Sequence, residues 1–170
     1  MWNHPGSRRA CSRSSTSPAL LSTQPADGGR ILESAKAAGY ATFGSDLVDR
    51  GHGRTADFLL DPLPLSPPFS IITNPPFDRI EAFARRALAS QAQKVAVVCP
   101  VRRLPAARWL QQTPLRTIYF LTPRPSMPPG HHIASGGKVG GGTVDFAWLI
   151  WERNYAGEAV LRWLTRVCRS

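Results

Sequence analysis

Asn74 is followed by Pro75, Pro76 and Phe77 at the end of an apolar run that spans residues 69–73. Two successive prolines cannot donate to a sheet ladder, so the run predicts a strand that stops at a rigid turn. The Asn74 side-chain oxygen and the Pro75 carbonyl each accept a hydrogen bond, and the Phe77 ring offers a stacking face. Such a set suits a planar group that carries an amine. We therefore take Asn74, Pro75 and Phe77 as candidate catalytic residues, the alternative being a proline-stopped strand with a buried Phe.

A second group of residues suits a nucleotide-like ligand. The glycine turn Pro25-Ala26-Asp27-Gly28-Gly29 lies between a candidate strand and a candidate helix, where backbone amides can approach a charged group closely. Asp46, at the end of the next strand, can accept hydrogen bonds from the hydroxyls of a ribose. Asp57 can accept from the amino group of a bound adenine while Phe58 packs against its ring. A turn or capping role for Asp46 and an ordinary loop position for Asp57 are the alternatives.

Metal and membrane chemistry are not indicated. The three cysteines are widely separated, with no CxxC pair and no His at ligand spacing. We therefore expect neither a zinc site nor a disulfide framework. A reducing, cytoplasmic setting fits them best. We interpret His131 and His132 as part of a solvated Pro/Gly loop. The apolar stretch from Phe146 to Trp151 is too short to span a membrane.

The charge balance indicates a polyanionic partner. The chain of 170 residues carries 21 Lys+Arg against 11 Asp+Glu, a net charge of +10, and nucleic acid is the simplest partner for it. Residues 1–18 are rich in Arg, Ser and Pro without an acidic residue, so we expect a disordered basic segment there. Residues 19–170 are long enough for one domain with its own core. The oligomeric state is not indicated.

Strand-like and helix-like segments alternate along the chain. The patterns predict strands at 19–21, 40–45, 56–60, 69–73, 94–99, 117–121 and 144–151, and helices at 30–38, at 80–88 with Asp78 as its cap, at 104–112 and at 157–167. This alternation is typical of a doubly wound, mostly parallel α/β sheet, with the last strand antiparallel. Such sheets bind ligands beyond the carboxyl ends of their strands, which is where Asp46 and Asn74 are expected.

Several blocks of residues occur in one order at compact spacings. They are Pro25-Ala26 with Gly28-Gly29, Ser45 to Gly51, Asp57-Phe58-Leu59 and Thr73 to Phe77, followed by Phe146 to Arg153. Together they resemble the class I methyltransferases of phages and bacteria described as N6-adenine type, over about residues 19 to 166. The resemblance implies a Rossmann-like fold with S-adenosylmethionine as the cofactor. It also implies a cofactor site that includes Leu47 beside the residues named above, and catalysis by the Asn-Pro-Pro-Phe motif.

The resemblance further implies methyl transfer to an exocyclic amino group, with adenine N6 in DNA as the expected target. RNA adenine, cytosine N4 and a protein glutamine amide are open alternatives. Family members usually carry Glu-Pro-Ala-x-Gly-x-Gly in the first turn, whereas this chain has Gln24-Pro25-Ala26-Asp27-Gly28-Gly29. That departure supports a competing hypothesis, a nucleic-acid-binding remnant that keeps the fold without catalysis. Any sequence specificity is expected from the loops at 61–68 and 122–143.

Overall fold

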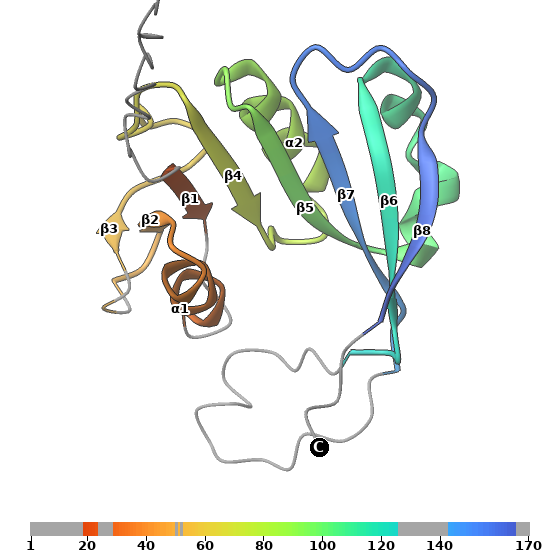
Figure 1. Cartoon of the computed structure of the whole chain (residues 1–170), viewed down its shortest axis with the longest axis horizontal. Coiled ribbons are helices and arrows are strands. Elements are labelled where there is room, and N and C mark those ends of the chain that lie inside the picture. Colours follow the sequence, from red (N-terminus) through yellow and green to blue (C-terminus); the bar gives the residue numbers. More distant parts are fainter. Residues whose placement is uncertain (1–18, 24–28, 50, 52, 126–142, 166–170) are drawn as a thin grey trace, which may run out of the picture.

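A computed structural model of the chain describes residues 19–23, 29–49, 51, 53–125 and 143–165. Eight strands form one sheet in the order β3-β2-β1-β4-β5-β7-β6-β8 (Figure 1). The strands are β1 (Ala19–Thr23), β2 (Ala41–Asp46), β3 (Arg54–Thr55), β4 (Phe69–Thr73), β5 (Lys94–Pro100), β6 (Leu115–Thr122), β7 (Phe146–Glu152) and β8 (Val160–Thr165). The helices are α1 (Arg30–Ala37), α2 (Ile80–Ala89) and the short 3₁₀ helices η1 (Val101–Ala106) and η2 (Arg108–Gln112).

The sheet is doubly wound and mostly parallel, as the sequence predicts. β1 pairs in parallel with both β2 and β4, and from there the sheet grows outward in two directions. β7 is antiparallel to its neighbours β5 and β6, which confirms the prediction for the strand at 144–151. The strand order therefore reverses between β1 and β4, and that is where sheets of this type open a crevice for ligands.

The two α-helices lie on opposite faces of the sheet. The β1–α1–β2 and β4–α2–β5 connections run in opposite directions, and because both crossovers are right-handed they place α1 and α2 on different sides (Figure 1). The main hydrophobic core lies on the α2 side. There Leu21, Ile71, Val95, Val97, Leu149 and Trp151 of the sheet are buried against α2, the segment that follows β3, and η2.

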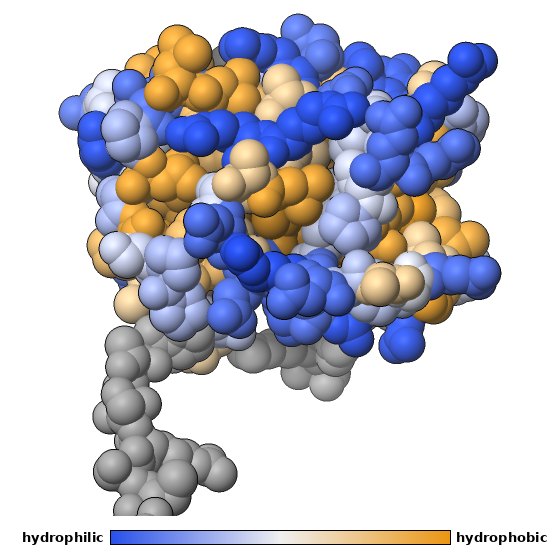
Figure 2. Space-filling view, turned by 90° about the horizontal axis from the view of Figure 1, so that it is seen from above, coloured by the Kyte–Doolittle hydropathy of each residue, from blue (hydrophilic) through white to orange (hydrophobic). Residues whose placement is uncertain are grey.

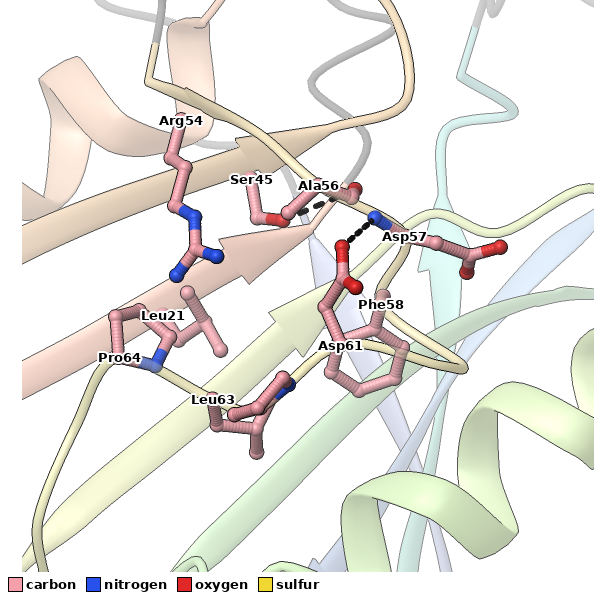
Figure 3. A pocket seen from close by; sticks show the side chains of 10 residues that line it. Leu21, Ser45, Arg54, Ala56, Asp57, Phe58, Asp61, Leu63 and Pro64 are labelled. Carbon is pink, nitrogen blue, oxygen red and sulfur yellow. Dashed lines mark hydrogen bonds between the residues drawn. The ribbon is translucent and has the colours of Figure 1, made fainter.

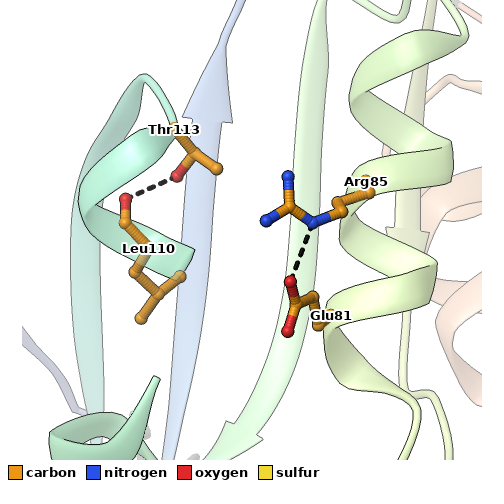
Figure 4. A network of polar contacts seen from close by, with 4 residues as sticks. All are labelled: Glu81, Arg85, Leu110 and Thr113. Carbon is orange, nitrogen blue, oxygen red and sulfur yellow. Dashed lines mark hydrogen bonds and ion pairs between the residues drawn. The ribbon is translucent and has the colours of Figure 1, made fainter. Parts of the chain in front are cut away.

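Helix α2 is held by one apolar face. Ile80, Phe83, Ala84 and Ala87 are buried, since positions three and four apart share a face of a helix. On its exposed face Glu81 and Arg85 form an i,i+4 ion pair of 2.8 Å (Figure 4). The prediction that Asp78 caps this helix is wrong: Arg79 is the capping position, and no side chain bonds to the first turn.

The helix predicted at 104–112 is replaced by η1 and η2. Pro105 lies within η1, and proline removes a backbone donor that an α-helix would need. Thr113 ends η2 by donating its hydroxyl to the Leu110 carbonyl at 2.7 Å (Figure 4). The same hydroxyl accepts a hydrogen bond from Trp151 Nε1 at 2.9 Å, which ties this segment to the core.

Two further predictions are corrected. The strand expected at 56–60 is a turn, because Asp57 Oδ1 accepts from the Leu59 amide and Asp61 Oδ2 accepts from the Asp57 amide, both at 2.8 Å. The helix expected at 157–167 is instead strand β8, which pairs in parallel with β6. Its Val-Leu-Arg-Trp-Leu-Thr sequence is rich in the β-branched and aromatic residues that favour strands.

The end of the molecule at which the parallel strands begin has a mixed surface. Figure 2 shows hydrophilic residues along much of this end, with hydrophobic residues in separate patches between them. The carboxyl ends of β1, β4 and β5 lie at the opposite end of the molecule (Figure 1). Among the described residues, no helix has the length and apolar character needed to cross a bilayer.

Leu149 should contribute much of the stability of the core. Its side chain is 0% exposed, so Leu149→Ala removes buried methyl groups and leaves a cavity, and we expect a loss of about 2–5 kcal/mol in the free energy of unfolding. Leu60→Ala is the matched control, because Leu60 is 80% exposed and its truncation should change stability by less than about 0.5 kcal/mol. Urea unfolding followed by circular dichroism measures both. Equal losses would contradict this placement of the core.

Candidate active site

The sheet brings Asp46 and Asn74 to one edge. Thr23 of β1 is level with Ser45 of β2 and with Thr73 of β4, so Asp46 and Asn74 each lie one residue beyond that level. With β1 between them, their backbones are two strand spacings apart, roughly 10 Å. A predicted ribose-binding carboxylate and a predicted catalytic amide therefore flank the switch point of the sheet.

Asn74 has a buried acceptor without a partner. Its Oδ1 atom is inaccessible to solvent and forms no hydrogen bond in the structure. The same is true, among the described residues, of the Ser22 and Thr42 hydroxyls, which lie in the sheet rather than at its edge. An unsatisfied buried acceptor costs about 1–3 kcal/mol, so its retention at the end of a strand favours a donor on a ligand as the missing partner.

The residues after Asn74 are held rigidly. Pro75 is fully buried, whereas Pro76 is exposed and its carbonyl accepts from the Arg79 amide at 2.9 Å, which closes the turn before α2. Phe77 is partly buried, and its ring centroid lies 5.6 Å from that of Phe146, the first residue of β7. The predicted catalytic residues are thus together, with an aromatic neighbour from a distant part of the chain.

The turn after β1 is described only at its end. Of the predicted cofactor residues, Pro25, Ala26, Asp27 and Gly28 lie outside the described residues. Gly29 is buried, has a φ of 81° and stands immediately before α1. A positive φ suits glycine, and the absence of a side chain leaves room beside the first turn of the helix.

Asp46 is nearly buried at the end of β2, and its Oδ1 accepts from the Val48 amide at 3.3 Å. Leu47, the next residue, is half exposed. The chain then returns tightly to β3: Gly53 has a φ of 154°, and a Cβ there would overlap the backbone carbonyl of Gly44 in β2. A short glycine turn thus replaces a helix between β2 and β3 and leaves the Asp46 edge uncovered by a helix.

Asp57 and Phe58 follow β3. Asp57 is half-buried, with one carboxylate oxygen used in the turn described above, and Figure 3 shows its carboxylate pointing away from the pocket beside it. That pocket is lined by Arg54, Leu63 and Pro64 among others (Figure 3). Its volume of about 10 Å³ leaves room for no more than a water molecule. Phe58 is 4% exposed and stacks on Phe83 with centroids 5.2 Å apart. Its ring therefore serves the core and has little surface left for a cofactor.

Charged groups surround the far end of the same edge. Arg124, after β6, forms a two-pronged ion pair with Asp145, before β7, at 2.7 and 3.1 Å, and the hydrogen bond to that carboxylate raises the pKa of Arg124. Arg102 and Arg103 of η1 are exposed and line a hollow of about 300 Å³ together with Phe77. Two arginines thus lie beside the predicted catalytic ring.

Cys99 is not a candidate nucleophile. Burial raises the pKa of its thiol to about 11, although Arg103 nearby acts in the opposite direction. At neutral pH the group is a packed thiol rather than a reactive thiolate. Among the described residues, no cluster of three or more His, Cys, Asp or Glu side chains could hold a metal ion.

Sequence reasoning missed two aromatic residues near this edge. Phe146 contacts Phe77, and Trp163 of β8 lies 6.0 Å from Phe120 of β6, measured between ring centroids. Phe146 could not be paired with Phe77 without knowing that β7 lies next to β5. Trp163 lies in the segment predicted as a helix, although the alternation of large residues around it is a signal for a strand.

Comparison with solved structures decides the type of fold. The 23S rRNA methyltransferase ErmE is 18% identical over 81% of this chain and 62% of its own, with a TM-score of 0.54. A putative RNA methyltransferase from Pyrococcus horikoshii is 9% identical over 79% of this chain and 74% of its own, with a TM-score of 0.58. A predicted O-methyltransferase from Agrobacterium tumefaciens is 12% identical over 87% of this chain and 79% of its own, with a TM-score of 0.50. This chain has the Rossmann-like fold of the class I methyltransferases.

The sequence itself adds no family assignment. No protein-family model matches it, and no curated protein sequence matches it. The chain spans 62% of the length of ErmE. At identities of 9–18%, the likeness concerns the methyltransferase fold alone.

The described residues of this fold fit S-adenosylmethionine in two respects. Gly29 permits a close backbone approach before α1, and Asp46 has its carboxylate at the end of β2. The ribose of the cofactor would lie against Asp46, with Leu47 beside it. Phe58 does not add to this fit, because its ring is in the core.

Asp46→Asn should weaken cofactor binding. A charge-assisted hydrogen bond contributes about 1.5–3 kcal/mol, so we expect the Kd for S-adenosylmethionine to rise roughly 10- to 100-fold. Isothermal titration measures the affinity. Asp49→Asn is the matched control, since Asp49 is exposed and accepts a hydrogen bond from the nearby Gly51 amide at 2.9 Å. Equal affinities of the two variants would show that Asp46 does not hold the ribose.

Proposed function

We propose that this chain is an S-adenosylmethionine-dependent methyltransferase that acts on the exocyclic amino group of a nucleic-acid base, adenine N6 above all. The observation that carries the proposal is the buried, unpartnered Oδ1 of Asn74 at the carboxyl end of β4. It stands before the fully buried Pro75 and near Phe77, in the fold that class I methyltransferases share. An acceptor held in place without a protein partner suits an amine that arrives with the substrate.

The proposed chemistry needs orientation more than a strong base. When bound, the cofactor supplies a methyl group already activated by a sulfonium. An aromatic amine is a poor nucleophile because its lone pair is delocalised into the ring. Asn74 Oδ1 and the Pro75 carbonyl would accept one N–H each, which favours a pyramidal nitrogen whose lone pair is directed outward. Phe77 would stack on the base, a contact worth about 1–3 kcal/mol.

Charge supports a nucleic-acid substrate over a protein amide. The chain carries a net charge of +10, and this overall charge is the support. The hollow beside Phe77 is lined by acidic Asp78 and Glu81 as well as by the exposed Arg102 and Arg103. Phosphate contacts from basic residues would offset the few kcal/mol needed to take a base out of a duplex. A cytoplasmic setting remains a prediction from the cysteine pattern.

DNA is the nucleic acid expected from the sequence, and RNA is the second candidate. RNA is favoured by two of the similar structures, an rRNA methyltransferase and a putative RNA methyltransferase by name. Cytosine N4 would present the same kind of amine to Asn74. The contrasting proposal is a nucleic-acid-binding remnant, supported by the glutamine at position 24 and the altered spacing of the glycines after it.

Methyl transfer to nucleosides tests the proposal directly. The chain is incubated with S-adenosylmethionine labelled in its methyl group and with unmethylated DNA or RNA, and the digested nucleosides are identified by mass. Label in N6-methyladenine nucleosides, in the deoxy or ribo form, is the expected result and identifies the nucleic acid. Saturable cofactor binding without label in any nucleoside would overturn the choice of substrate, and no cofactor binding would support the remnant.

Asn74→Ala should separate activity from stability. Losing one preorganised polar group in a transition state typically costs about 100- to 1,000-fold in kcat, and we expect a loss of that size with little change in cofactor affinity. Because the substitution also removes an unsatisfied buried acceptor, the variant should unfold at the same or a higher urea concentration.

The matched control for Asn74→Ala is Gln112→Ala, which removes an exposed amide at the end of η2. Its kcat should equal that of the unaltered chain. A structural role for Asn74 would reverse the pattern, with a clear loss of stability and a kcat that falls no further than the folded fraction does.

A further inference from the structure

An aromatic hollow lies at the carboxyl end of β6, away from Asp46. It has a volume of about 470 Å³, within the range of small-molecule sites, and its lining includes Phe120, Phe146, Trp163, Arg124 and Asp145. The Phe120 and Trp163 rings are 6.0 Å apart and tilted by 42°. Two non-parallel aromatic rings thus open onto a space large enough for a flat heterocycle.

Trp163 is unusually exposed for its size. Strand β8 is the last strand of the sheet, all six of its residues are exposed, and Trp163 has 71% of its surface in contact with solvent (Figure 1). Edge strands of stable proteins are commonly protected by charges, prolines or covering elements, and a large indole in water serves none of these purposes. A ligand that covers the ring would account for its position.

The chemistry of the hollow favours a nucleobase. The two charged residues in its lining, Arg124 and Asp145, are paired with each other, so the aromatic rings rather than a net charge select the ligand. Arg162 precedes Trp163 in β8 and therefore lies on the opposite face of the strand. Aromatic rings on which bases stack are a common platform for single-stranded nucleic acid. A second copy paired along β8 is less favoured, because a two-fold axis near the middle of the strand brings Arg162 close to its own symmetry mate.

The hollow is connected to the proposed catalytic site. Phe146 lines it and also contacts Phe77, with ring centroids 5.6 Å apart. Along the strand order β4-β5-β7-β6-β8, Asn74 and Trp163 are separated by four strand spacings, roughly 19 Å. At about 3.4 Å for each stacked nucleotide, that distance corresponds to roughly six nucleotides, and to fewer in an extended strand.

We propose that the hollow lined by Phe120 and Trp163 binds an unpaired base of the nucleic-acid substrate, a few nucleotides away from the base presented to Asn74. The location relative to the target base rests on the proposed function. The stacking itself does not. Because stacking on these rings needs a base face that is not covered by its neighbours in a duplex, the substrate class is a single strand or a locally opened duplex.

Binding of a labelled single strand tests this site. The probe is a fluorescein-labelled 12-nucleotide strand of mixed sequence, and its affinity is measured by anisotropy. Trp163→Ala should weaken binding roughly 5- to 100-fold, whereas Trp163→Phe, which keeps a stacking ring, should stay close to the unaltered chain. The salt dependence should be unchanged in both, since no phosphate contact is lost. Leu60→Ala, a truncation of another exposed apolar residue, is the matched control and should leave the affinity as it was.

Substrate length and pairing sharpen the test. A trinucleotide is too short to reach both Asn74 and Trp163, so Trp163→Ala should leave methyl transfer to a trinucleotide unchanged while raising the KM for the 12-nucleotide strand. A duplex of the same sequence should bind less dependently on Trp163 than the single strand does. Equal affinity of Trp163→Ala and the unaltered chain for the single strand overturns the proposal. If β8 instead joins two copies of the chain, Trp163→Ala should in addition sediment more slowly than the unaltered chain.

The failure of this proposal and that of the methyltransferase proposal are distinguishable. Trp163-dependent binding without label in any nucleoside leaves the stacking site standing and removes the proposed chemistry. Methyl transfer that depends on Asn74, with Trp163→Ala equal to the unaltered chain in affinity and KM, removes the stacking site alone.

Discussion

The proline pair after β4 is the constraint on which the candidate site depends. Pro75 cannot donate to a neighbouring strand, and its ring restricts the residue before it to an extended conformation. Asn74 is therefore the last extended residue of its segment, at a height fixed by the pairing of β4 with β1. The same turn is closed by the Arg79 amide on the Pro76 carbonyl, so the start of α2 is fixed as well. A single rigid corner thus positions the amide, the aromatic ring and the helix that covers the core.

The fold tolerates large changes in sequence because its constraints are few. Parallel strands need alternate apolar residues against a helix, and their carboxyl ends then meet at one edge whatever the remaining residues are. Identities of 9–18% with three methyltransferase structures are consistent with that. Function in such a sheet is carried by residues at and beyond the carboxyl ends of the strands, the place that Asp46 and Asn74 occupy here, so the sheet alone does not select a substrate.

The elements with strong local patterns could be predicted from the sequence. The sequence predicts β4 with the observed bounds, because its apolar run is delimited by prolines on both sides. It predicts α1 to within one residue, because Gly39, with a φ of 87°, ends the helix. β8 could not be predicted in this way, since the apolar residues of its segment fit the spacing of a helix as well as the alternation of a strand. The contact of Phe146 with Phe77 and the unpartnered Oδ1 of Asn74 depend on which strands become neighbours, and no local pattern contains that information. Phe58 shows the same limit of local patterns. Its position after Asp57 suits contact with a ligand, but in the fold its ring stacks on Phe83 in the core.

The ion pair between Arg124 and Asp145 has a consequence for how this fold can change. Arg124 follows β6 and Asp145 precedes β7. The amide of Val101, the residue after β5, donates to the Asp145 carbonyl at 2.9 Å and holds the same point. A segment whose two ends are clamped together can be lengthened, shortened or exchanged at small cost, since doubling a loop adds only about 0.6 kcal/mol of closure entropy. The pairing of β6 with β7 therefore does not depend on the length of the chain between Arg124 and Asp145, and the sheet keeps its register when that length changes.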